Sequence, residues 1–344
     1  MISVAIATCN GQAYLHQQLD SILNQTRLPD EVVISDDKST DETLGIIEDF
    51  SKTAPFNVKV IRNSIRLGFE ANFIQAAEHC AGEIIFFCDQ DDVWSHRKVQ
   101  TCLTEFQSDE TVTIVIHSGK LIGTKNKHQP TRYPHILKRK VYSPSNAPIA
   151  PNSPSFAISI RKHVLKLCKL TDVMSPSGVP TYAHDSLLYF WASTIGKAVF
   201  IPDELVFYRQ HSSNHCGAPL SDLSTRFKLS MSKMNPESYY FNEIEWAFSR
   251  AKLIAERLEE HGLTYTSLSS GRSELWLRRA LAMELRYKIY MSPKHKAILE
   301  FTKSLFHGAY TSKVIGYGLT SLLRDFTFAT NFLPLLQKLS NMDK

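Results

Sequence analysis

Four short apolar runs, which start about 25 to 30 residues apart, constrain the fold of this chain more than any other feature. The runs at Ser3–Ala7, Glu31–Ser35, Val58–Arg62 and Ile84–Cys88 are rich in Val and Ile and have the length of buried strands. The segments between them carry apolar residues at three- and four-residue spacing, as amphipathic helices do. This alternation predicts βαβ units and a largely parallel sheet flanked by helices.

The first three helices have recognisable limits in the sequence. Apolar side chains line one face of Leu15–Leu23, and Ser39 with Glu42 has the spacing of a capping box that opens a helix through Phe50. A third apolar stripe ends near Gly82, which we expect to act as a helix C-cap.

Strand patterns weaken after residue 100 and disappear beyond about Leu223. Thr113–Ser118 and Ala198–Pro202 are expected to be strands, whereas Phe241–His261 and Glu274–Tyr290 have helical spacing. We therefore expect an α/β domain at residues 1–220 and an α-helical domain at residues 221–344.

Composition separates the two parts and excludes several classes of protein. Residues 1–225 contain 21 Lys and Arg against 23 Asp and Glu, whereas residues 226–344 contain 18 against 11. The hydrophobic share of 43% fits a globular protein and excludes collagen and long disorder. The six cysteines form no CxxC pair, so neither a zinc site nor a disulfide framework is expected. The first residues do not resemble a signal peptide, which favours a cytoplasmic location.

Polar residues follow each of the four predicted strands. Thr8, Asp36 with Asp37, Asn63 and Asp89 stand at the ends of the runs. Because ligands of open α/β sheets bind at the carboxyl ends of the strands, we expect the binding site at this edge.

The segment Asp89-Gln90-Asp91-Asp92 places three carboxylates in four positions. Such a group is costly unless a cation or hydrogen-bond donors compensate it, and Mg²⁺ or Mn²⁺ accepts one or two carboxylates together with diphosphate oxygens. The alternative is an acidic turn in which Asp92 or Ser95 caps the next helix. No GxGxxG or GxxxxGK[ST] motif is present, so a phosphate held by these acids has to be held through a metal.

In combination, several segments resemble the family 2 glycosyltransferases, which have the GT-A fold, a Rossmann-like, mostly parallel mixed sheet. The nearest likeness is to bacterial rhamnosyltransferase-like members that build surface polysaccharides such as O-antigen. The matching segments are SVAIATCNG (3–11), SILNQ (21–25), VISDDKSTD (33–41), GEIIFFCDQDDVW (82–94), His184-Asp185 and YRQHSSN (208–214).

The resemblance implies roles for the residues at the strand ends. Thr8 would lie at the nucleotide edge, and Asp37 would bond the base with Asp36 beside it. Asp89 would contact the ribose, and Asp91, in the DXD motif, would ligate the metal ion on the diphosphate.

Other matching positions would serve the acceptor and the reaction. Asp92, Trp94 and His184 would lie on the acceptor side, and Asp185 matches the catalytic base. Without the resemblance, Asp185 would be read as the cap of a helix over Ser186–Ser193.

The YRQH string adds two residues on the donor side. Arg209 is expected to pair with the diphosphate, and His211 to ligate the metal or bond an oxygen. A stretch that frames the acceptor in relatives reads Pro154–Ala157 here.

The resemblance as a whole implies an inverting, divalent-cation-dependent hexosyl- or deoxyhexosyltransferase. It would move a sugar from a nucleotide-sugar donor to a hydroxyl of a glycan acceptor, which we expect to be lipid-linked. Two alternatives stay open: a nucleotidyltransferase, and a non-catalytic protein that binds nucleotide sugars or acts as a scaffold.

The basic C-terminal part carries its own expectations. In Arg272–Lys296, four cations mix with apolar residues, as in segments that lie on an anionic leaflet: Arg278, Arg279, Arg286 and Lys288. Peripheral contact with the cytoplasmic face of the inner membrane is one interpretation, and an ordinary helical domain or a protein-binding helix is another. Nucleic acid is not expected as a partner, because no recognised binding module is present.

Overall fold

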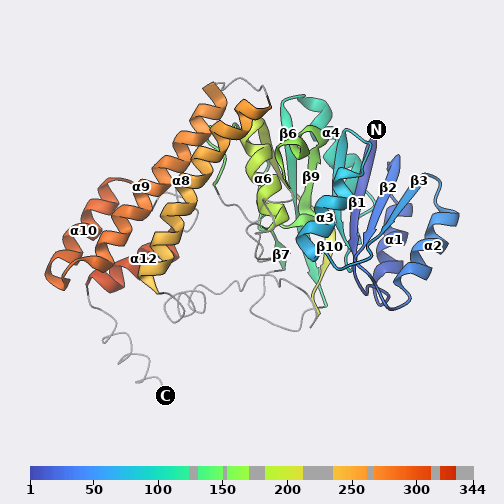
Figure 1. The fold of residues 1–344 in the computed structure, drawn as a ribbon, viewed down its shortest axis with the longest axis horizontal. Coiled ribbons are helices and arrows are strands. Elements are labelled where there is room, and N and C mark those ends of the chain that lie inside the picture. Colours follow the sequence, from blue (N-terminus) through green and yellow to red (C-terminus); the bar gives the residue numbers. More distant parts are fainter. Residues whose placement is uncertain are drawn as a thin grey trace, which may run out of the picture. The chain divides into compact units, whose positions relative to one another are not determined.

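The computed structural model describes residues 1–123, 131–149, 153–169, 183–211, 235–261, 267–310 and 318–330. The chain forms two compact units (Figure 1). Unit 1 consists of residues 1–144 and 152–219, and unit 2 of residues 145–151 and 220–344. Unit 2 therefore includes residues 145–151, which lie between the two parts of unit 1 in the sequence.

Unit 1 is a mixed α/β layer structure. Its strands are β1 (Ile2–Thr8), β2 (Glu31–Asp36), β3 (Asn57–Arg62), β4 (Ile84–Asp89), β5 (Val93–Trp94), β6 (Val112–Ile122), β7 (Arg132–Tyr133), β8 (Lys140–Tyr142), β9 (Ile158–Arg161) and β10 (Lys197–Arg209). Its helices are α1 (Leu15–Leu23), α2 (Thr43–Thr53), α3 (Phe69–Glu78), α4 (Lys98–Ser108) and α6 (His184–Ile195), with 3₁₀ turns η1 (Ser155–Ala157) and η2 (Lys162–Leu167).

The strands form one sheet in the order β3-β2-β1-β4-β9-β6-β10-β5, with β7 on β6 and β8 on β10. The pairs among β3, β2, β1 and β4 are parallel, and β9 runs antiparallel between β4 and β6. All residues of β1 and β2 are buried, as expected for parallel strands covered on both faces. The predicted α/β fold with successive βαβ units is confirmed.

Two local predictions were wrong. Helix α2 begins at Thr43 rather than at a Ser39 cap, because the Ser39 hydroxyl donates to Asp36 instead of accepting from the helix. Asp41 accepts the backbone N–H of Thr43. Helix α3 ends at Glu78, and Gly82 is required for another reason: a Cβ there would lie 2.5 Å from the Ser3 hydroxyl oxygen.

Unit 2 is α-helical in the part that the structure describes. Its helices are α8 (Pro236–Glu260), α9 (Ser267–Met291), α10 (Lys294–Phe306) and α12 (Gly318–Ala329). The long helices α8 and α9 pack along each other, and α10 and α12 pack on α9 (Figure 1). No helix in the described ranges is both long and apolar enough to cross a bilayer.

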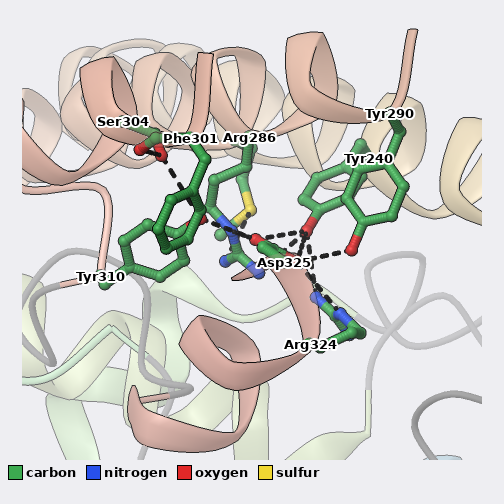
Figure 2. Close-up of polar contacts among 9 residues, drawn as sticks. Tyr240, Arg286, Tyr290, Phe301, Ser304, Tyr310, Arg324 and Asp325 are labelled. Carbon is green, nitrogen blue, oxygen red and sulfur yellow. Dashed lines mark hydrogen bonds and ion pairs between the residues drawn. The ribbon is translucent and has the colours of Figure 1, made fainter. Parts of the chain in front are cut away.

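A buried carboxylate, Asp325 of α12, organises the interior of unit 2 (Figure 2). Arg286 of α9 donates to it at 2.7 Å, and Tyr240, Tyr290 and Tyr310 donate their hydroxyls at 2.6–3.1 Å. These contacts join α8, α9, α12 and the segment after α10. Because a buried charge is costly unless it is paired, this cluster fixes how the helices pack.

The same contacts correct one expectation from the sequence. Arg279 and Arg286 were expected among cations facing a membrane, but both side chains are buried. Arg279 pairs with Glu243 of α8, and Arg286 pairs with Asp325. These residues lie seven apart on α9 and point into the unit, so they cannot lie on a leaflet.

Candidate functional site

The carboxyl edge of the central strands brings together residues that are far apart in the sequence. Thr8 at the end of β1 is in register with Asp36 of β2, and Ala7 is in register with Asp89 of β4. The strand order therefore places Asp36 and Asp89 on either side of β1, at one edge of the sheet.

Asp36 and Asp37 are buried and bonded to the protein itself. The carboxylate of Asp36 accepts the Thr8 hydroxyl at 2.9 Å and both the backbone N–H and the hydroxyl of Ser39. Asp37 accepts the backbone N–H groups of Leu67 and Gly68 at 2.7 and 2.9 Å. Both acids thus fix the loops around the expected nucleotide edge, and a contact with the base stays a prediction.

The loops that follow β1 and β4 are joined by a two-way hydrogen bond. The Gln90 side-chain oxygen accepts from Cys9 N–H at 2.9 Å, and its amide nitrogen donates to the Cys9 carbonyl at 3.1 Å. A Cβ on Gly11 would lie 2.3 Å from that Gln90 oxygen, so a larger residue there would displace the Gln90 side chain from this hydrogen-bond pair. Gln90 is not among the residues expected from the sequence, although it lies between Asp89 and Asp91.

Asp89 ends β4 beside the first residue of η1. The Ser155 hydroxyl lies 3.0 Å from one carboxylate oxygen of Asp89 and 3.2 Å from the other. Burial, and then the charge of Asp91, raise the pKa of Asp89 to about 7. The acidic strand end therefore lacks full compensation of its negative charge.

Asp91 contacts the residues that were predicted for the donor side. His211 lies with its Nε2 2.8 Å from a carboxylate oxygen of Asp91, and the side chains are 15% and 18% exposed. Arg209 donates to the Asp91 carbonyl at 2.8 Å. Tyr14 stacks on the His211 ring at 4.8 Å and lies under the Arg209 guanidinium at 4.9 Å. The sequence analysis missed Tyr14, which no motif indicates.

The three residues expected on the acceptor side are buried instead. Asp92 is fully buried and accepts the Arg209 backbone N–H at 2.9 Å, and burial raises its pKa well above the usual range. Trp94 is 3% exposed, and its ring lies 3.8 Å from the ammonium of Lys98. His184 is 1% exposed and stacks on Phe73 at 4.5 Å. Their place on the acceptor side stays a prediction.

Lys98 is a functional candidate that the sequence analysis missed. Its ammonium is fully buried, and it donates to the Phe156 carbonyl at 2.7 Å. Burial lowers its pKa to about 8. Because Phe156 follows Ser155 in η1, Lys98 fixes the turn whose serine contacts Asp89.

Asp185 lies in the first turn of α6, where the N-cap is Ala183. Its carboxylate is near enough to Asp89 for its charge to raise the pKa of Asp89 further. Burial, with a contribution from Glu70, raises the pKa of Asp185 itself to about 6. A half-buried carboxylate with such a pKa suits a general base at neutral pH.

Asp89 and Asp91 have the chemistry of a divalent-cation site in which substrate phosphates supply the remaining ligands. Asp89 and Asp91 repel each other at the strand end, and Asp91 lies against His211. Among the described residues, no three His, Cys, Asp or Glu side chains form a ready-made metal cluster. Mg²⁺ and Mn²⁺ bind through one or two carboxylates and substrate phosphates, so the residues present fit such an ion.

Comparison with known proteins finds a family model that matches the part of the chain containing β1 to β4. The family model described as "Glycosyl transferase family 2" matches residues 3–167. An uncharacterized glycosyltransferase from Nostoc is 29% identical over 70% of this chain and 74% of its own length. The dTDP-rhamnosyl transferase RfbG of Shigella flexneri is 26% identical over 63% of this chain and 75% of its own length.

A solved structure shares the fold over nearly the whole chain. Residues 1–349 of Staphylococcus aureus TarS, crystallised with UDP-GlcNAc, superpose with a TM-score of 0.57 and 16% identity. The match covers 97% of this chain and 91% of that one. The likeness shows that the chain has the fold of that protein.

Proposed function

Because residues 3–167 match the family model of glycosyl transferase family 2, we propose that the chain transfers a sugar from a nucleotide-sugar donor to a hydroxyl group of a glycan acceptor. The observation that carries the proposal is that Asp89, at the end of β4, lies within range of the charges of both Asp91 and Asp185 of α6. These residues supply the two functions that such a transfer needs, a site for the diphosphate and a base.

We propose an inverting single displacement. The acceptor oxygen forms a bond to the anomeric carbon while the bond from that carbon to the diphosphate oxygen breaks, with its electron pair leaving on the nucleoside diphosphate. The hydroxyl proton passes to Asp185. The leaving diphosphate needs no proton, so one base is sufficient.

A divalent cation, when bound, would offset the negative charge that develops on the diphosphate. Asp91, with His211 beside it, would hold the ion, and Asp89 would accept from the ribose. Arg209 lies close to Asp91 and adds a positive charge on the same side. Its guanidinium already bonds Gln17 at 2.6 Å, which orients it.

The relatives also support a proposal about the substrate class. RfbG carries the name of a dTDP-rhamnosyl transferase, which favours a deoxyhexosyl or hexosyl donor and a cell-surface polysaccharide as product. We propose a lipid-linked acceptor, used on the cytoplasmic face of the membrane by a peripherally bound protein.

A thermal-shift screen of nucleotide sugars with Mn²⁺ tests the donor assignment. Selective stabilisation by one nucleotide sugar, followed by its transfer to an acceptor, is the expected result. The released product separates the alternatives: a glycosyltransferase releases a nucleoside diphosphate, and a nucleotidyltransferase releases pyrophosphate. A protein that binds the donor but neither transfers nor hydrolyses it would be a binding protein.

A further inference from the structure

Helix α10 of unit 2 exposes large apolar side chains on one side. Ile298, Leu299 and Leu305 are 51%, 53% and 43% exposed, and Phe306 is 86% exposed. Four such residues in one 13-residue helix are more than the scattered apolar side chains of an ordinary protein surface.

The exposed side adjoins a well-packed interior. Ala297 and Phe301 on the other side of α10 pack with Ile289 of α9 and Ala329 of α12. The Phe301 ring lies 5.6 Å from that of Phe326 of α12, which is itself 44% exposed. Ile298 and Leu305 stand about one turn before and after Phe301 on the helix. We call Ile298, Leu299, Leu305, Phe306 and Phe326 the α10 face.

Exposed cations border the α10 face. At 100° per residue, Lys296 and Lys303 lie on one side of the apolar arc of α10 and Lys294 on the other. Lys303 pairs with Glu300 at 2.7 Å. Within the described ranges, neither Lys294 nor Lys296 forms an ion pair.

We propose that the α10 face binds an anionic membrane surface. The apolar side chains would enter the boundary between headgroups and acyl chains, and the lysines would lie among the anionic headgroups. The charge arrangement favours this occupant over a second copy of the chain, because a two-fold dimer through this face would bring its own cations together. This inference rests on the proposed function, in which the protein binds the membrane peripherally to reach a lipid-linked acceptor, and it names the surface that makes the contact.

Vesicle sedimentation of the full chain tests this surface. The vesicles contain phosphatidylcholine alone or with about 30% phosphatidylglycerol. One variant, Leu299→Ser with Phe306→Ser, removes apolar contact, and another, Lys294→Glu with Lys296→Glu, reverses charge. Their matched controls are Phe248→Ser, an exposed residue of α8, and Lys138→Glu with Lys140→Glu, exposed residues of unit 1 with the same spacing.

We expect binding only to the anionic vesicles, and weaker binding at high salt. Each α10 variant should weaken binding about tenfold or more, and the controls should bind as the wild type does. Absence of vesicle binding, or equal binding by the α10 variants, would overturn the proposal. So would a dimer that these variants convert to a monomer, because a second copy would then cover the face. Donor binding measured on the same samples is independent of these outcomes, so a failure of the proposed function would be seen separately.

Discussion

At the scale of single residues, Asp185 combines position and pKa in a way that fits a base. It stands about a hundred residues from the acidic strand end in the sequence, yet its charge acts on Asp89. Burial raises its pKa to about 6 and keeps enough of it ionised at neutral pH to accept a proton.

We predict that Asp185→Asn retains donor binding and loses turnover by about 10²–10⁴-fold, because the amide cannot accept the hydroxyl proton. Calorimetry with the donor and a transfer assay measure the two effects. Asp20→Asn, a change of an exposed carboxylate on α1, is the control. Turnover close to that of the wild type would remove Asp185 from the mechanism.

The pH dependence of turnover gives a second test of the same residue. The base works when ionised, so turnover should rise with pH and reach half its maximum near the pKa of about 6. The charge of Glu70 contributes to this raised pKa, so Glu70→Gln should move the rise to lower pH. A pH profile that does not move in Glu70→Gln would argue against Asp185 as the titrating group.

Lys98 gives a prediction about positioning. Lys98→Met removes a buried ammonium, which favours folding, and leaves the Phe156 carbonyl without its donor, which opposes folding. These effects offset each other, so the variant should fold, while its KM for the donor rises about tenfold because Ser155 is held less firmly against Asp89. Lys59→Met on the exposed side of β3 is the control. A folded Lys98→Met protein with an unchanged KM would contradict this role.

At the scale of elements, the strands were predictable and several side-chain environments were not. Runs such as Ile84–Cys88 predict buried parallel strands, because a strand covered on both faces is apolar throughout. The polar residues that directly follow these runs were predictable too, because they mark where each strand ends. The burial of Asp92 was not, because only the tertiary structure places the Arg209 N–H against it.

The packing of the C-terminal helices was not predictable from the sequence either. Helical spacing predicts α8 and α9, but a segment rich in both Arg and apolar residues does not indicate which side packs inwards. Arg286 is buried because Asp325 of α12 reaches it, a contact across 39 residues of sequence. Arg278 and Lys288 of the same helix are exposed and pair with Glu274 and Glu284.

The Asp325 cluster gives a prediction about stability. Asp325→Ala leaves the buried Arg286 without its carboxylate and should lower the free energy of unfolding by about 3–5 kcal/mol. Glu284→Ala, which breaks the exposed pair with Lys288, should cost less than about 1 kcal/mol. Urea unfolding followed by circular dichroism compares the two variants. Equal effects would show that the buried contact does not hold the helices together.

In the molecule as a whole, we propose that the two units have separate functions. Unit 1 contains the donor edge and the base, and unit 2 contains the α10 face. We therefore expect changes on α10 to leave donor binding intact, and changes at Asp91 to leave vesicle binding intact.

In the proposed mechanism, Asp91 at the end of β4 binds the donor diphosphate through a divalent cation. Titration calorimetry of the nucleoside diphosphate, with and without Mn²⁺, tests it most directly in the wild type, Asp91→Asn and Asp185→Asn. We expect binding that requires Mn²⁺ in the wild type and in Asp185→Asn, and loss of this binding in Asp91→Asn. Tight binding without the metal, or Mn²⁺-dependent binding that survives in Asp91→Asn, would contradict it.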